Sequence, residues 1–220
     1  MLPCFVFLLS CYSVNYGYAY LKDYLDIHCP AFDLLSDSRK NYVLKNIIKG
    51  LYLPVLVVCG GILLGPSARK LRTFNNTIIR CLAGMYVSND LIGLYRVEEL
   101  PTTTKMHHSI SLVFLFIAWV VDFQTNNFAQ LLLFYCYFSA ISFPVNLYLG
   151  LRLCYSEPLP RLRSIAKWSY LVCLLINWWL QFSLIEYSTD TLAYLFLLLF
   201  IVYDDIILLR WLWLGKRRTN

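Results

Sequence analysis

Long apolar stretches separated by short polar connections dominate the chain. Seven such stretches lie near residues 2–20, 47–66, 78–97, 106–123, 129–151, 168–185 and 191–214. Most approach the length of about 20 residues that one helix needs to cross the hydrocarbon core of a bilayer. A segment in lipid must satisfy its own backbone hydrogen bonds, so each stretch is predicted to be a helix. The pattern therefore predicts an all-α, polytopic membrane helix bundle.

The first apolar stretch is the weakest of the seven. It is rich in tyrosine and is interrupted by Ser13, Asn15 and Gly17. It has no basic n-region and no clear small-residue cleavage site, which favours a retained span, with a signal peptide as the open alternative. The longest polar stretch follows at residues 21–46 and is predicted to be a cytosolic loop with a short surface helix.

The composition narrows the class of protein further. Hydrophobic residues make up 59% of the chain and charged residues only 15%, against roughly 25% charged in soluble domains. This excludes a disordered protein, a disulfide-stapled secreted domain, a nucleic-acid-binding protein and a soluble multidomain enzyme. Four of the eight cysteines lie in apolar runs and the others show no CxxC or metal-ligand spacing. We therefore predict free thiols, with at most one exposed pair, and no metal site.

The basic residues predict an orientation. Of the 19 lysines and arginines, 15 fall in the segments around 21–49, 96–105, 152–167 and 210–220, which alternate to one side of the bundle. Short cytoplasmic loops carry the excess of positive charge in membrane proteins. The C-terminus is therefore predicted to be cytosolic.

Two adjacent histidines, His107 and His108, stand near the start of an apolar stretch, shortly after Pro101. Proline and the threonines that follow it suit a helix N-terminus. Neighbouring residues on a helix point about 100° apart, so at most one imidazole can face a given cavity squarely. Imidazole is suited to proton transfer near neutral pH, which makes both residues catalytic candidates. Solvation at the membrane edge is the alternative.

Three acidic residues lie well inside apolar stretches, away from the ends of those stretches. Asp90 stands in the third stretch, and Asp204 and Asp205 stand near the middle of the last. An ionisable group at such depth costs about 2.5–3.5 kcal/mol on insertion scales, so each is expected to face the bundle interior and to have a partner. Asp90 is a catalytic candidate or a structural hydrogen-bonding group. For Asp204 and Asp205, function and pairing with Arg210 or Gln181 are both open.

Other polar side chains in apolar stretches are candidates for lining a cavity. They are Asn89, Asn146, Asn177 and Gln181, together with Asp204 and Asp205. Any one amide could equally be a bond between helices worth about 0.6 kcal/mol. Together they predict a bundle with a partly polar interior.

The run YVSNDLIGLY from Tyr86 to Tyr95, followed after a short loop by Met106-His107-His108 at a helix start, resembles the signature of the TLC-domain family. Residues 36–42 and 155–163 are similar to flanking segments of that family, and the resemblance covers about residues 37–218. The family includes the ceramide synthases and several smaller lipid-related proteins. We therefore divide the chain into an N-terminal span and loop, residues 1–36, and a TLC-like transmembrane domain, residues 37–220.

The resemblance implies six helices ringed around a central cavity, generally in the endoplasmic reticulum. In ceramide synthases the paired histidines serve acyl transfer from acyl-CoA to a sphingoid amine. Carried over, His107 or His108 would be the base or nucleophile, and Asp90 would orient it or stabilise its charge. The synthases continue with a polar motif, whereas residues 109–121 are apolar here and no histidine follows. This departure favours the smaller members of the family.

The preferred function is that of a TLC-domain protein that binds or modifies a lipid and influences membrane lipid composition. An acyl-CoA-dependent N-acyltransferase, with acyl-CoA as co-substrate, is the first alternative. A cargo or trafficking receptor is the second, motivated by the tail Lys216-Arg217-Arg218, for which a retrieval signal and a topology anchor are both open. A seven-span receptor or channel has no gating or selectivity motif to support it. Membrane lipids are the expected partners, with no resident cofactor and no nucleic acid; a homo-oligomer stays open.

Overall fold

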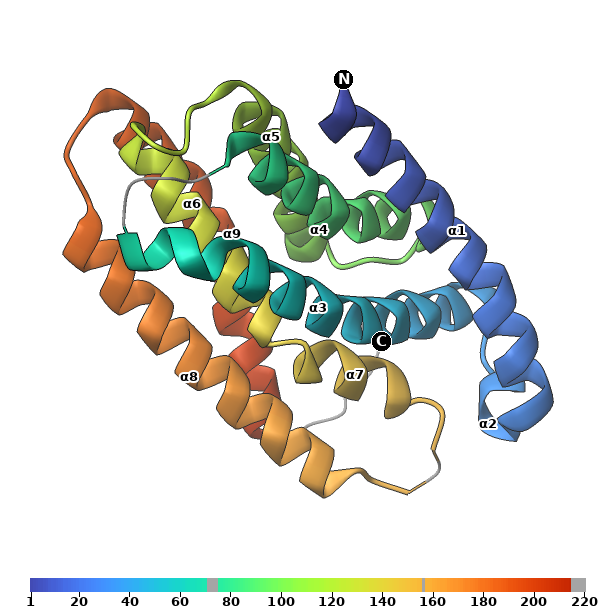
Figure 1. Ribbon diagram of the computed structural model, residues 1–220. Helices are drawn as coiled ribbons and strands as arrows, with labels where there is room; N and C mark the ends of the chain where they lie inside the picture. The colour runs from blue at the N-terminus through green and yellow to red at the C-terminus, as the bar shows by residue number, and fades with distance from the viewer. Residues whose placement is uncertain (71–74, 156, 215–220) are drawn as a thin grey trace.

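The computed structural model describes residues 1–70, 75–155 and 157–214, with the backbone alone over 63–70. Within these ranges the chain is all helical and contains no strand. The helices are α1 (Leu2–His28), α2 (Pro30–Asp33), α3 (Asp37–Lys70), α4 (Asn76–Arg96), α5 (Thr102–Val120), α6 (Asn127–Ile141), α7 (Pro144–Leu151), α8 (Pro160–Leu184) and α9 (Thr189–Leu214). Figure 1 shows them as one bundle of mostly long helices.

Local sequence explains where several helices begin. Proline occupies the first turn of α2, α7 and α8, where its missing N–H costs no hydrogen bond. Asparagine caps two others: the Asn75 side chain accepts a hydrogen bond from the Ile78 amide, and the Asn126 side chain accepts one from the Ala129 amide. The helix boundaries therefore follow ordinary capping chemistry.

Among the described residues, two helices are long and apolar enough to cross a membrane, Asp37–Ile62 within α3 and Thr189–Leu214, which is α9. A third span is formed if α6 and α7 count as one helix, bent by 44° at a short break before Pro144. The other long helices carry more polar side chains, and the spans predicted on them stay predictions. The all-helical fold and its compatibility with a membrane are as predicted from the apolar pattern.

One exposed, apolar face of α9 supports the compatibility of the fold with a membrane. Large apolar side chains on it point away from the protein at helical spacing, namely Leu192, Phe196, Leu199, Tyr203 and Ile206. A contiguous apolar stripe of this kind is unfavourable in water and suited to lipid or to another apolar surface.

The prediction of a loop at residues 21–46 was wrong. Helix α1 continues to His28, α2 follows it directly, and α3 begins at Asp37. Ion pairs hold these polar helix ends together: Lys22 Nζ lies 2.8 Å from Asp26, and Lys40 Nζ lies 3.0 Å from the same carboxylate. A pair of opposite charges four residues apart adds about 0.2–0.5 kcal/mol to a helix. Leu25, Phe32 and Val43 also lie together in one buried apolar cluster.

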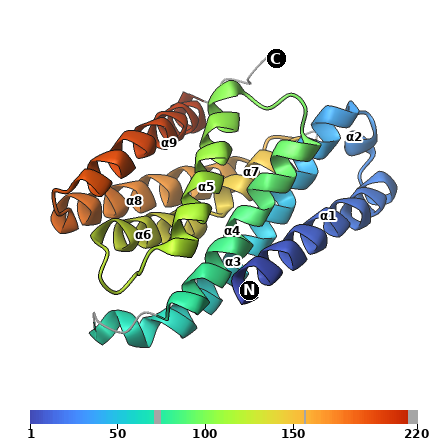
Figure 2. The same ribbon diagram turned by 90° about the horizontal axis from the view of Figure 1, so that it is seen from above.

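The packing order of the helices places α5 in the middle of the bundle. Helix α1 packs against α4 and α3; α4 packs against α3 and α5; α5 packs against α9. On the other side α8 packs against α6, α7 and α9, and α7 packs against α3. Figure 2 shows α6, α8 and α9 on one side of α5 and α1, α3 and α4 on the other.

Helices α3 and α7 approach closely because glycines stand at their contact. A Cβ atom added at Gly50 of α3 would lie 2.6 Å from the Leu147 side chain and 2.9 Å from the Leu147 backbone nitrogen. One added at Gly150 of α7 would lie 2.7 Å from the Ile47 side chain. Small residues of this kind let two helix backbones come together.

The connection between α5 and α6 is held by one exposed carboxylate. The Asn76 amide donates to Asp122 at 2.8 Å, and the Gln124 amide and the Thr125 hydroxyl donate to it as well. These hydrogen bonds hold the pKa of Asp122 below its ordinary value, and the bond from Asn76 has the largest effect. Asp122 is exposed and lies just beyond the end of α5.

Candidate functional site

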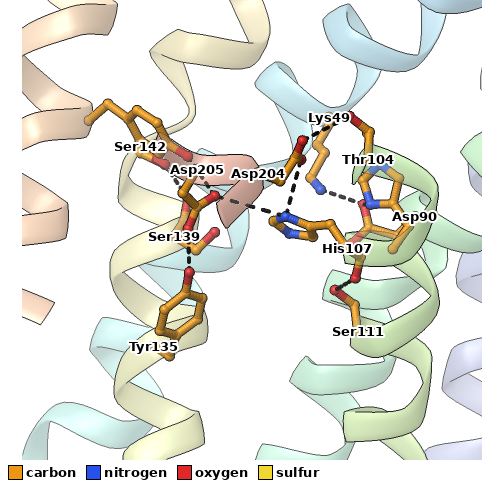
Figure 3. A network of polar contacts seen from close by, with 12 residues as sticks. Lys49, Asp90, Thr104, His107, Ser111, Tyr135, Ser139, Ser142, Asp204 and Asp205 are labelled. Atoms are coloured by element: carbon orange, nitrogen blue, oxygen red, sulfur yellow. Dashed lines mark hydrogen bonds and ion pairs between the residues drawn. The ribbon is translucent and has the colours of Figure 1, made fainter. Parts of the chain in front are cut away.

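The site lies where α3, α4, α5 and α9 face one another. Helix α5 contributes His107 and His108 from its second turn, and α3 contributes Lys45 and Lys49, which share one face because they are four residues apart. Asp90 comes from α4. Figure 3 shows the acidic residues of α9 on one side of His107, and Lys49 and Asp90 on the other.

His108 is held between a lysine and a carboxylate. Its Nε2 lies 2.7 Å from Lys45 Nζ, and its Nδ1 lies 3.0 Å from Asp90 Oδ1. An ammonium can only donate, so Nε2 accepts and the imidazole proton of the neutral ring resides on Nδ1, on the side of Asp90. Within the described residues Nδ1 has no formed hydrogen bond, so its contact with Asp90 is a close polar approach. His108 is 5% exposed.

Asp90 also forms an ion pair with Lys49, whose Nζ donates to the same Oδ1 atom. The Asp90 side chain is fully buried, and within the described residues its second oxygen has no hydrogen-bond partner. A buried carboxylate needs such pairing because the low dielectric strongly disfavours an isolated charge. The resulting line of contacts is Lys45–His108–Asp90–Lys49.

His107 faces a different set of groups. Its Nδ1 lies 3.5 Å from Asp204 Oδ2 and 3.9 Å from Asp205 Oδ1, both on α9 (Figure 3). The Thr104 hydroxyl donates to Asp204 at 3.3 Å. The two imidazoles therefore point to different carboxylates, as the angle between neighbouring residues on a helix requires. Their ring centroids are 5.4 Å apart.

Asp205 is satisfied by tyrosines. The Tyr170 hydroxyl of α8 donates to it at 2.6 Å, and the Tyr135 hydroxyl of α6 donates to its other oxygen. In the described part of the chain, the contacts of the two acids of α9 are with His107, Thr103, Thr104 and these tyrosines, and neither acid pairs with Arg210 or Gln181. These contacts tie α6, α8 and α9 together beside the histidines.

Two cavities meet at this site. A polar one of about 120 Å³ is bordered by both histidines, Lys45, Lys49, Asn146, Arg152, Asp204 and Asp205. An apolar one of about 90 Å³ is bordered mainly by α4, α5 and α6, including Val87, Phe114, Leu115, Ala118 and Leu132. Tyr86 and His107 border both cavities. Of the two imidazoles, His107 therefore stands at the junction, and His108 borders only the polar cavity.

Of the other residues predicted to line a cavity, some border a cavity and others only form hydrogen bonds or are buried elsewhere. Asn146 borders the polar cavity, and Asn177 borders a separate small cavity of about 10 Å³ next to Asp205. Gln181 borders neither of the two main cavities; it donates to the Leu131 carbonyl at 2.9 Å and accepts from the Tyr194 hydroxyl. Asn89 is buried outside both main cavities, and neither of its amide atoms has a hydrogen-bond partner in the described structure.

Sequence reasoning missed Lys45 and Lys49. The distribution of basic residues explains them only as topological charges, whereas both are buried and contact the predicted site. A signal was available, because two lysines four residues apart at the edge of an apolar stretch must find anionic or polar partners inside the bundle. The tyrosines at positions 86, 135 and 170 carried no comparable signal, since the chain contains 17 tyrosines.

Across the described ranges, no three histidine, cysteine or acidic side chains are arranged to hold a metal ion. All eight cysteines are free thiols. The fold and site thus define an all-helical chain with membrane-compatible helices and a buried network of charges. Comparison with protein-family models, curated proteins and solved structures finds no match to the chain.

Proposed function

We propose that this chain binds a membrane lipid inside its helix bundle, with the polar end in the polar cavity and the hydrocarbon in the apolar cavity. The observation that carries the proposal is the meeting of the two cavities at Tyr86 and His107. Small-molecule sites are mostly apolar with a few placed polar groups, and an amphipathic ligand would satisfy both halves at once. Through such binding the protein would influence membrane lipid composition.

The packing order supports the TLC-like arrangement that the sequence resembles. Contacts run from α3 to α4, α5, α9, α8 and α7, and from α7 back to α3. With α6 and α7 taken as one bent span, this order is compatible with six spans around the site. Location in the endoplasmic reticulum with a cytosolic C-terminus is part of the same proposal and rests on the resemblance and the basic residues.

The lipid proposal predicts that filling the apolar cavity abolishes binding. Ser111 borders that cavity on α5, so Ser111→Trp would occupy the space for a hydrocarbon chain. We expect at least tenfold less lipid per mole of protein purified in detergent, measured by mass spectrometry of the extracted lipids. Ser109→Trp is the matched control, since Ser109 is exposed on the same helix. Equal lipid content in folded Ser111→Trp and wild-type protein would contradict the proposal.

A second candidate is acyl transfer from acyl-CoA to a lipid amine, favoured by the position of His107. Its imidazole stands at the cavity junction within 3.5 Å of Asp204. There it could accept the proton that the amine loses as it attacks the thioester carbonyl and the CoA thiolate leaves. His108 is less suited, because Lys45 occupies its accepting nitrogen. The tail that motivated the receptor alternative lies outside the described residues.

If the chain is such an acyltransferase, loss of the base should be severe. Purified protein supplied with labelled acyl-CoA and a long-chain base should form an amide, and His107→Ala should slow it by about 10²–10⁴-fold. His28→Ala, at an exposed position on α1, is the control. Absence of amide product from the wild-type protein, or equal rates with His107→Ala, would eliminate this candidate and leave lipid binding intact.

A further inference from the structure

The polar cavity carries opposite charges on different helices. Two cations, Lys45 and Lys49, come from α3, and a third, Arg152, follows α7. The acids Asp204 and Asp205 come from α9. The histidine pair of α5 lies between Lys45 and Asp204, because His108 contacts the lysine and His107 contacts the acid. The cavity is therefore polarised along the line of the two imidazoles.

Part of this charge is already compensated by the protein. Lys49 is paired with Asp90, and Asp205 accepts hydrogen bonds from Tyr135 and Tyr170. These groups have their partners and do not require a ligand.

The positive charge of Lys45 has no such partner within the described residues. Its side chain is 4% exposed, and its one hydrogen bond goes to a neutral imidazole nitrogen. An ammonium has three N–H donors, so two are left over, and across the described residues no carboxylate lies within ion-pair distance of its Nζ. A buried ammonium without an anion is strongly disfavoured. Arg152, stacked 4.5 Å from the Trp211 ring centroid, likewise has no described carboxylate partner.

Asp204 is an acidic side chain in the same cavity that is only weakly satisfied by the protein. Its carboxylate contacts the Thr103 side chain, and its other contacts are long, 3.3 Å from Thr104 and 3.5 Å from His107. The Asp204 side chain is 13% exposed at the polar cavity. Normal hydrogen bonds to a carboxylate are shorter, near 2.7–2.9 Å when the donor is an ammonium. Asp204 therefore retains capacity to accept from a ligand.

We propose that the lipid bound here is zwitterionic, with a phosphate and a primary ammonium in its head group, as in phosphatidylethanolamine. This inference rests on the proposed lipid-binding function. The phosphate contacts Lys45 and Arg152, whose side chains are the usual ligands of phosphate oxygens. The ammonium donates to Asp204 on the far side of the histidine pair. The acyl chains enter the apolar cavity beyond His107.

The test compares head groups on the purified full-length chain in detergent. Dioctanoyl phosphatidylethanolamine, dioctanoyl phosphatidylglycerol and dioctanoylglycerol are titrated separately, and binding is measured by native mass spectrometry. We expect the ethanolamine lipid to bind about tenfold more tightly than the glycerol phospholipid, and both phospholipids more tightly than dioctanoylglycerol, as one charge-assisted contact predicts. Asp204→Asn should abolish the first preference while retaining phosphatidylglycerol binding.

Lys45→Gln should weaken both phospholipids about tenfold relative to dioctanoylglycerol, and Lys45→Arg should retain them. Asp190→Asn and Lys105→Gln, at exposed positions on α9 and α5, are the matched controls. Equal affinity of wild-type protein for the two phospholipids, or an unchanged preference in Asp204→Asn, would overturn the zwitterionic assignment alone. Failure of all three lipids to bind folded wild-type protein would overturn the proposed function as well.

Discussion

Lys49→Met is expected to lower the free energy of unfolding by about 3–5 kcal/mol, because it leaves the buried Asp90 carboxylate without its cation. The remaining neighbour, His108, lies 3.0 Å from the carboxylate without a formed hydrogen bond. The measurement is denaturant unfolding of the purified protein in detergent, followed by the loss of helical circular dichroism.

The double variant Lys49→Met, Asp90→Asn distinguishes the buried charge from lost packing. Neutralising the carboxylate should restore much of the stability, since replacing both members of a buried pair is far less costly than removing one. Lys22→Met removes an ion pair in which the lysine side chain is 45% exposed and should cost about 0.2–1 kcal/mol. If the two single variants had equal stability, the buried pair would not be a principal contact of the fold.

Gly50→Ala is expected to destabilise the protein by about 1–3 kcal/mol or more, because the added methyl meets the backbone of α7. The Leu147 nitrogen would lie 2.9 Å from the new Cβ, and backbone cannot move away as a flexible side chain can. Gly150→Ala should act similarly, since Ile47 N and Val43 O would each lie 3.1 Å from its Cβ. Thermal unfolding in detergent measures both.

A glycine outside this contact is the matched control. At Gly17 the nearest atom to an added Cβ is the Ile48 Cδ1 atom at 3.7 Å, an ordinary contact. Gly17→Ala should therefore be neutral or stabilising, by up to about 1 kcal/mol from helix propensity. The separation of α3 from α7 by Gly50→Ala should also weaken lipid binding, because both helices border the polar cavity. Unchanged stability in Gly50→Ala would mean that the two helices are not in close contact.

The sequence predicted the apolar helices better than it predicted the polar segment at residues 21–46. Apolar runs of span length have one structural solution in lipid, so most of the long helices followed from hydropathy. The stretch 129–151, predicted as one helix, is instead divided into α6 and α7 before Pro144. Residues 21–46 have no such run; side chains of α1, α2 and α3 share one buried apolar cluster there, and Lys40 of α3 pairs with Asp26 of α1. Contacts between helices cannot be inferred from a local pattern.

The candidate site was predicted in its parts but not in its pairing. The cost of ionisable groups in lipid identified Asp90, Asp204 and Asp205, and the doublet identified the histidines. Which acid faces which histidine depends on how α4 and α9 pack around α5. The hydropathy of a single sequence gives no information about this packing. Lys45 was overlooked because a lysine near a span end is usually explained by topology. Catalysis by His107, His108 and Asp90 stays a prediction.

The adjacency of His107 and His108 has a mechanical consequence for α5. One imidazole contacts α3 and α4, the other contacts α9, and both are fixed to the same turn of one helix. Any rotation of α5 that shortened the 3.5 Å approach to Asp204 would change the geometry of the Asp90 contact at the same time. Contacts from both halves of the bundle therefore fix the rotation of α5 about its own axis. A ligand that changed the contacts of one imidazole would change those of the other through this rotation.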